Sequence, residues 1–235
     1  MHCHILPGLD DGAESFEESL AMARMAAADG VRTIVATPHM DDRYVYPEPD
    51  RLRDLTGRLN ELIQAEGIPL RVLPGAEVRT GMELVERLQA GKIMTVGDGG
   101  KYVLVELPTS GAAVYAGELF FRLQVAGYTP ILAHAERVDQ FRREPRLLQE
   151  LRERNVRVQV NAESLSGQAG RVLRNFALRL VKDGLADVLG SDGHNVDSRK
   201  PLLTVAQHNL RGHNGLFERL TQTTPQSFLT PPNGR

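Results

Sequence analysis

The sequence alternates regularly between short apolar runs and longer segments in which apolar residues recur at helical spacing. The apolar runs have the length of buried strands and lie at residues 31–36, 69–74, 102–107, 129–133, 156–160 and 186–190. The helical segments lie at residues 11–30 (a loop leading into a helix), 50–67, 82–90, 114–126, 145–155 and 169–183. This alternation predicts a parallel sheet with helical crossovers, hence an α/β fold.

The alternation lacks a glycine-rich phosphate loop, which favours a closed (β/α) barrel over an open nucleotide-binding sheet. A length of 235 residues suits one such domain, and no linker or internal repeat divides it. We therefore expect a single domain over residues 1–210, with a final helix that starts near Lys200 and Pro201. Residues 211–235 are polar and offer few core candidates, so we expect a C-terminal tail that is partly frayed.

Charge and composition exclude several classes of partner. The net charge of −2 gives no basic field for nucleic acid or an anionic membrane, and no apolar run is long enough to insert into one. A single cysteine rules out an intramolecular disulfide and a cysteine-based zinc cluster, and fits a reducing compartment. The first residues do not form a secretory signal. We expect a cytoplasmic protein, and the sequence does not specify its oligomeric state.

Histidine, aspartate and glutamate residues follow the predicted strands. In a barrel of βα units the functional face is where strands end. The residues near these ends, together with the opening stretch, are His2, His4, Asp11, His39, Glu77, Glu106, His134, Asp192 and His194, which include five of the seven histidines. An extended backbone would place both imidazoles of His2-Cys3-His4 on one face and Cys3 on the other.

Each of these residues alone has an ordinary structural role open to it: Glu77 could cap a helix, His134 could be a core histidine, and Asp192 could sit in a turn. Their occurrence together at one face predicts a multinuclear metal site. Imidazole with carboxylate suits Zn, Mn or Fe without choosing among them. Paired ions of this kind fit phosphoester hydrolysis best, with amide or ring hydrolysis second.

Two arginines lie on loops that leave the same face. Arg137 follows His134 by three residues, and Arg199 follows His194 by five. The planar fork of a guanidinium matches phosphate oxygens, so both are candidates to bind a substrate phosphate. The alternative is that they form surface ion pairs with Glu136 or Asp197.

The opening stretch, His2-Cys3-His4-Ile5-Leu6-Pro7-Gly8-Leu9-Asp10-Asp11-Gly12, resembles the first motif of the polymerase and histidinol phosphatase (PHP) superfamily. Within this superfamily, the amino-acid sequence of the stretch is similar to that of bacterial protein-tyrosine phosphatases associated with capsule and exopolysaccharide synthesis. Further matches run in family order at residues 36–39, 73–77, 104–108, 127–134 and 191–195.

The resemblance implies a distorted (β/α)7 TIM-like barrel of the PHP type with two to three divalent ions. Manganese would be favoured, with zinc, iron, cobalt or magnesium possible. One ion would be held by His2, His4, Glu77 and Asp192, a second by Glu77, Glu106 and His134, and a third by Asp11, His39 and His194. Asp10 would then be a loop or capping carboxylate.

The implied activity is hydrolysis of phosphotyrosine through a metal-bridging hydroxide, on a cognate bacterial tyrosine autokinase that controls capsule or exopolysaccharide synthesis. Arg137 and Arg199 would neutralise the phosphate, and Asp11 or His194 could protonate the leaving oxygen, or a metal could hold it. Cys3 has no Cys-x5-Arg phosphate loop and should be catalytically idle.

Two positions depart from the family pattern. Only Met1 precedes His2, where relatives carry a few more residues, so the first strand is short or the start lies upstream. Ala135 stands where a proline often follows the histidine. The competing interpretations are a histidinol-phosphate phosphatase with the same metal site and a non-catalytic PHP regulatory module.

Overall fold

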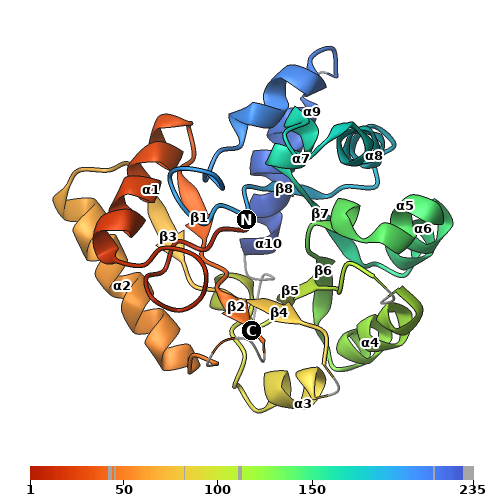
Figure 1. Cartoon of the computed structure of the whole chain (residues 1–235). Coiled ribbons are helices and arrows are strands. Elements are labelled where there is room, and N and C mark those ends of the chain that lie inside the picture. Colours follow the sequence, from red (N-terminus) through yellow and green to blue (C-terminus); the bar gives the residue numbers. More distant parts are fainter. Residues whose placement is uncertain (42–43, 45, 82, 111–112, 214, 230–235) are drawn as a thin grey trace.

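The computed structural model describes residues 1–41, 44, 46–81, 83–110, 113–213 and 215–229. In Figure 1 the strands gather at the centre of the molecule, and the longer helices surround them. The protein is thus a mixed α/β protein, as the sequence predicts. Within the described part of the chain, no helix combines the length and the apolar character needed to cross a membrane.

The strands pair in parallel throughout two sheets. The smaller sheet contains β1 (Thr33–Val35) and β3 (Arg71–Leu73). The larger sheet has six strands in the order β2 (His39–Met40), β4 (Glu77–Arg79), β5 (Tyr102–Glu106), β6 (Thr129–Leu132), β7 (Arg157–Asn161) and β8 (Val188–Gly190). All six predicted strands are present, whereas β2 and β4 are short additions that follow β1 and β3 along the chain.

The N-terminal segment lies between the first and last of these strands. Cys3 forms isolated parallel bridges with Ala36, just after β1, and with Gly193, just after β8. The main-chain N–H of His4 donates to the Gly193 carbonyl at 2.8 Å, and that of Thr37 donates to the Cys3 carbonyl at 2.9 Å. The N-terminal segment therefore connects the smaller sheet, through β1, with the far edge of the larger sheet, at β8, and the parallel strands together form a curled arrangement.

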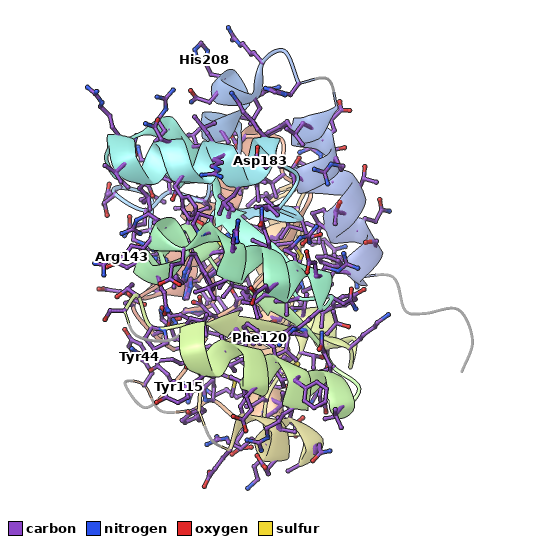
Figure 2. The ribbon with its side chains drawn as sticks, turned by 90° about the vertical axis from the view of Figure 1, so that its right-hand side faces the viewer. Tyr44, Tyr115, Phe120, Arg143, Asp183 and His208 are labelled. Carbon is purple, nitrogen blue, oxygen red and sulfur yellow. The ribbon has the colours of Figure 1, made fainter. Side chains whose placement is uncertain are left out.

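The helices follow the predicted order. They are α1 (Phe16–Ala28), α2 (Pro49–Ala65), α3 (Leu84–Gln89), α4 (Ala113–Val125), α5 (Asp139–Arg143), α6 (Pro145–Glu153), α7 (Ala162–Ser166) and α8 (Arg171–Lys182), with short 3-10 turns η1 (Val96–Asp98) and η2 (Ala135–Arg137). Each buries one apolar stripe. On α4, for example, Phe120 is buried while Tyr115 is exposed (Figure 2).

The predicted final helix near Lys200 is wrong. Residues 200–203 are not helical, and the 3-10 helix η3 (Thr204–Leu210) begins only after them. The main-chain carbonyl of Arg199 accepts hydrogen bonds from the N–H groups of His194 and Asn195, at 2.7 and 3.1 Å. Gly193 also packs closely on Pro201, because a Cβ added to Gly193 would lie 2.6 Å from the Cα of Pro201. These contacts fold the segment back onto the end of β8 as a loop.

Within the tail that the sequence predicts to be partly frayed, residues 216–229 are helical. This part forms α9 (Leu216–Glu218), η4 (Arg219–Thr223) and α10 (Thr224–Leu229). Leu220 and Phe228 are buried, and the Phe228 ring lies 4.5 Å from that of Tyr102. A few well-spaced apolar residues thus dock a segment that is otherwise polar, while residues 230–235 lie outside the described part of the chain.

A small apolar cluster lies beneath the ends of the strands. It contains Val35, Val96, Leu104, Ile131, Ala133, Val188 and Phe228. Tyr102, Leu104 and Glu106 occupy every second position of β5 and therefore lie on one face of the strand. This face carries the Phe228 contact at Tyr102 and a predicted metal ligand at Glu106. Helix α10 therefore packs at one end of this face, and the polar residues gather at the other.

Candidate metal centre

Four side-chain atoms from three chain segments converge as a compact group. The Nε2 atoms of His2 and His4 lie 3.2 Å apart. Glu77 Oε2 lies 3.2 and 3.4 Å from them, and Asp192 Oδ1 lies 3.3 and 3.5 Å from them. Ligands at about 2.0–2.1 Å from a tetrahedral ion are separated by about 3.3–3.4 Å, so the spacings among His2, His4 and Glu77 match three positions of a first metal seat, and Asp192 lies beside both imidazoles.

The second oxygen of Glu77 points to another group. Glu77 Oε1 lies 2.9 Å from His134 Nε2, which is 3.9 Å from Glu106 Oε1. Ligand atoms of these three residues lie within 4.8 Å of one another. One carboxylate thus presents its two oxygens to two ligand groups, the geometry needed for a bridge between ions.

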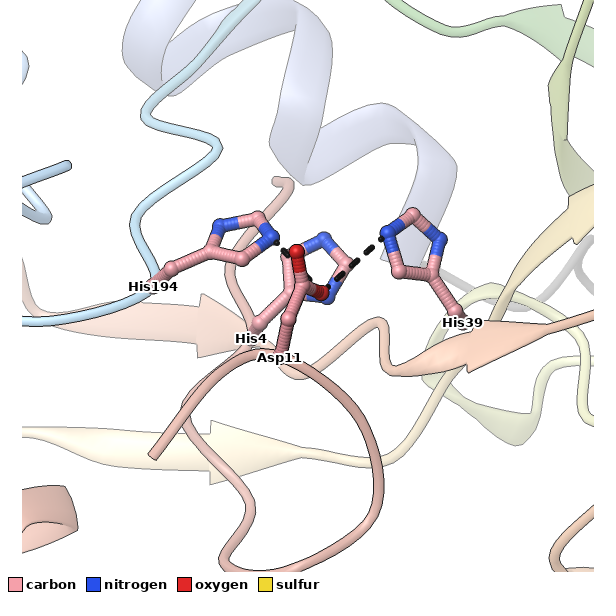
Figure 3. Close-up of side chains that lie close together, drawn as sticks. All are labelled: His4, Asp11, His39 and His194. Atoms are coloured by element: carbon pink, nitrogen blue, oxygen red, sulfur yellow. Dashed lines mark ion pairs between the residues drawn. The ribbon is translucent and has the colours of Figure 1, made fainter. Parts of the chain in front are cut away.

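The third expected group is also assembled. His39 Nε2 and His194 Nε2 lie 3.5 and 3.3 Å from Asp11 Oδ1, and a ligand atom of His4 belongs to the same cluster (Figure 3). Asp11 is about half exposed, whereas the three imidazoles are buried. This group therefore stands at the open side of the centre.

One potential ligand was missed by the sequence analysis. Ligand atoms of Asp41 lie within 4.8 Å of those of His39 and Glu106, and Asp41 is buried. The missed signal was the spacing of His39-Met40-Asp41. Because side chains alternate along an extended segment, Asp41 follows His39 on the same face, as His4 follows His2.

Asp10 does more than the capping role assigned to it. It accepts a hydrogen bond from the main-chain N–H of Gly12 at 2.9 Å, as a turn residue would. It also lies 2.6 Å from His4 Nδ1 and accepts from the N–H of His39 at 2.8 Å. Asp10 therefore fixes the His4 ring with Nε2 facing the metal seat, the usual function of a carboxylate behind a ligating histidine.

The charges of the group show how strongly its members depend on one another. Burial raises the pKa of Glu77 and Asp192, but the surrounding imidazoles, His2 first among them, outweigh burial and hold both values well below the usual range. Burial lowers the pKa of His134, yet Glu77 outweighs this effect and raises that pKa to about 9. The protons held in this way are those a bound cation would displace.

Two buried atoms test whether the residues fit a metal. Among the described residues, neither Glu77 Oε2 nor His194 Nε2 forms a well-oriented hydrogen bond, although Glu77 Oε2 lies 3.2 Å from His2 and His194 Nε2 lies 3.3 Å from Asp11. Buried polar atoms whose hydrogen-bonding capacity is not met are costly, and both atoms belong to the ligand groups above. Together with a set of imidazole and carboxylate donors, they fit divalent cations.

Both candidate arginines reach the same carboxylate. Arg137 Nη1 lies 3.1 Å from Asp192 Oδ2, and Arg199 Nη2 lies 3.0 Å from Asp192 Oδ1. Arg199 Nη1 is also 3.6 Å from Asp11 Oδ2. Within the described part of the chain, both arginines thus pair with site carboxylates and not with Glu136 or Asp197, and each side chain keeps about one third of its surface exposed.

Cys3 faces away from the ligands. Its side chain is buried, and its Sγ donates to the Gly193 carbonyl at 3.4 Å. Burial raises the pKa of this thiol to about 11, so it stays protonated at neutral pH.

The fold and the donor atoms define a class: an α/β protein with a group of imidazole and carboxylate donors suited to divalent cations near the carboxyl ends of its parallel strands. The chain belongs to the CpsB/CapC family of capsular polysaccharide synthesis, whose profile matches residues 1–229. The family indicated by the sequence motifs is thereby confirmed.

Individual relatives agree with this assignment. The chain is 42% identical over 199 residues to the tyrosine-protein phosphatase YwqE of Bacillus subtilis, covering 85% of this chain and 78% of YwqE. It is 29% identical to the tyrosine-protein phosphatase CpsB of Streptococcus pneumoniae, covering 88% and 86%.

Structural comparison gives the same result. A crystal structure from work on YwqE and CpsB, described as unique metal-dependent tyrosine phosphatases, superposes with a TM-score of 0.91 at 37% identity and covers 100% of this chain and 98% of that one. Dihydropyrimidinase from Brevibacillus agri shares the fold alone, with a TM-score of 0.53 at 11% identity, over 95% of this chain and 67% of that one.

Proposed function

We propose that this chain is a metal-dependent protein-tyrosine phosphatase of capsule or exopolysaccharide synthesis. One observation carries the proposal: Glu77 presents separate oxygens to two ligand groups, one of which contains the carboxylate that both arginines contact. This arrangement suits a phosphoryl group held between paired cations and guanidinium groups. The curated names of the relatives support the choice of phosphotyrosine.

We also propose that the fold is a distorted (β/α)7 barrel of the PHP type. The segment around Cys3, β1 with β2, β3 with β4, and then β5 to β8 make seven strand positions, which supports this topology. We also propose that residues 1–210 form one catalytic domain.

The proposed ligand set is the one that the resemblance implied, with two to three divalent ions and manganese favoured. His2, His4, Glu77 and Asp192 would hold one ion, Glu77, Glu106 and His134 a second, and Asp11, His39 and His194 a third. When bound, the ions supply an activated water nucleophile and positive charge for the phosphoryl oxygens.

The chain's own residues supply the rest. Arg137 and Arg199 bind the phosphate oxygens and stabilise the charge that spreads over them in the transition state. The Asp11–His194 pair lies at the open side with its atoms 3.3 Å apart, and it could pass a proton to the leaving oxygen when the third ion is absent. With that ion bound, the leaving oxygen would be held there instead. Tyrosine, with a pKa of about 10, is a good leaving group and needs little such help.

The proposed substrate is a phosphotyrosine protein, namely a cognate bacterial tyrosine kinase, and the proposed location is the cytoplasm. Of the alternatives, histidinol phosphate would use the same ions with a different pocket. A non-catalytic module would lack ligands, whereas every expected ligand position carries a suitable residue, and the grouping of their donor atoms supports the catalytic proposal.

The test compares three substrates on the metal-loaded protein: a phosphotyrosine peptide, histidinol phosphate and single-stranded DNA. We expect metal-dependent phosphate release from the peptide and little or none from the other two. Phosphate release from histidinol phosphate alone would replace the proposal with the first alternative, and no turnover of any substrate would favour the regulatory module.

A further inference from the structure

Strand β7 supplies none of the proposed ligands, yet it carries two buried polar side chains. Gln159 and Asn161 are both fully buried. They are two positions apart on β7, so their side chains lie on the same face, and Asn161 lies opposite Gly190 of β8. Buried amides must form hydrogen bonds to offset their desolvation, so their partners reveal their role.

The partners are metal ligands on three other segments. Gln159 Oε1 lies 3.2 Å from His2 Nδ1 and accepts a hydrogen bond from the main-chain N–H of His134 at 2.7 Å. Gln159 Nε2 donates to Asn161 Oδ1 at 2.7 Å, and Asn161 Nδ2 donates to Asp192 Oδ2 at 2.7 Å. Two adjacent amides therefore connect His2, His134 and Asp192.

The two ends of this chain of hydrogen bonds fix its direction. The N–H of His134 can only donate, so the atom facing it must be the Gln159 oxygen. The carboxylate of Asp192 accepts, so the atom facing it must be the Asn161 nitrogen. His2 Nδ1 must then donate to Gln159 Oε1, which leaves the lone pair of His2 Nε2 directed at Glu77 and Asp192.

Two further features show that the packing accommodates this network. An added Cβ on Gly190 would lie 2.6 Å from Gln159 Nε2 and 2.8 Å from His2 Cβ, so glycine makes the room that the amide occupies. His134 and Asp192 have φ angles of 28° and 50°, in the region that residues other than glycine seldom adopt. The network contacts both residues and helps hold them in these conformations.

We propose that Gln159 and Asn161 are positioning residues of the metal centre, which fix the His2 tautomer and the orientation of Asp192 for one ion and the backbone of His134 for its neighbour. The inference rests on the metal centre proposed above. A strand without ligands thereby aligns ligands from the N-terminal segment, β6 and β8. Polar residues at alternate positions of a predicted buried strand are the signal that could have revealed them.

The test measures metal binding without substrate, so it can fail independently of the phosphatase assignment. The Gln159→Met and Asn161→Leu variants keep similar volume and remove the hydrogen bonds. We expect each to weaken Mn²⁺ affinity about 10–100-fold, measured by titrating metal-free protein and counting bound ions. The matched control is Asn60→Leu. The Asn60 amide forms two hydrogen bonds of 2.8 Å with the main chain of Val72, and it contacts none of the proposed ligands.

The control should lower the melting temperature but leave Mn²⁺ affinity within about twofold, given that it touches no ligand. A second measurement uses the wild-type protein loaded with Zn²⁺ and labelled with ¹⁵N at histidine. It should show His2 protonated at Nδ1 and coordinated through Nε2. Unchanged affinity in folded Gln159→Met and Asn161→Leu proteins, or His2 coordinated through Nδ1, would overturn the proposal.

Discussion

Removal of the Arg199 side chain tests the proposed phosphate site most directly. The guanidinium lies 3.0 Å from Asp192 and 3.6 Å from Asp11, so a phosphoryl group at the centre meets it at a similar range. The main-chain carbonyl of Arg199 organises the loop through bonds to His194 and Asn195, and the Arg199→Ala substitution leaves that carbonyl in place. The variant therefore removes charge while retaining the local fold.

The size of the effect follows from Coulomb's law. Two unit charges about 4 Å apart interact by about 4 kcal/mol at an effective dielectric constant of about 20. The Arg199 side chain is one third exposed, and solvent screening reduces this to about 2 kcal/mol. We therefore expect Arg199→Ala to lower kcat/KM for a phosphotyrosine peptide by about 30-fold. Arg199→Lys keeps the charge but loses the planar fork, so its loss should be nearer fivefold.

The assay pairs steady-state kinetics with metal analysis of the same samples. Metal content should stay at the wild-type value in Arg199→Ala, because no proposed ligand is removed. Arg53→Ala is the matched control, because Arg53 forms surface ion pairs with Asp50 of α2 and Asp98 of η1. If Arg199→Ala keeps kcat/KM within about twofold of wild type, the phosphate role is refuted.

Three further predictions concern other parts of the molecule. Glu77→Gln should reduce bound metal by about one ion per chain, because a neutral amide is a poor bridge between cations, and unchanged metal content would rule out the bridging role. Iodoacetamide at pH 8 should neither modify Cys3 nor reduce activity, because the thiol is buried and its pKa, raised to about 11, keeps it protonated; rapid inactivation with alkylation at Cys3 would contradict this. Phe228→Ala should destabilise the fold by about 3 kcal/mol in urea unfolding, because the ring is buried against Tyr102, and an unchanged midpoint would mean that α10 does not support the core.

The sequence predicted the strand ends well because apolar runs and ligand residues mark them independently. It missed β2 and β4 because strands such as His39–Met40 are too short to show a period. Their existence depends on pairing with neighbours distant in sequence, as when His39 aligns with Glu77. Local patterns do not contain that information.

The errors at the C-terminal end have a similar cause. Lys200 and Pro201 resemble a helix start, but main-chain bonds to Arg199 and the close contact with Gly193 override this local preference. Phe228 appeared isolated in a polar tail, and its partner Tyr102 lies far away in the sequence. The sequence gives Asp10 too small a role for the same reason, because one of its three partners, His39, comes from another segment.

The bridges from Cys3 to Ala36 and Gly193 bring the first residues next to the segment that follows β8, so a metal ion bound there would also affect the stability of the fold. His2 and His4 begin the chain, Asp192 follows its last strand, and under the proposed ligand set one ion joins all three. Such an ion closes residues 2–192 into a loop, as a covalent cross-link would. At a free concentration 100 times its dissociation constant, one ion adds about 2.7 kcal/mol to the folded state. A protein whose single cysteine cannot form an internal disulfide thus gains a reversible equivalent, the strength of which depends on the supply of metal.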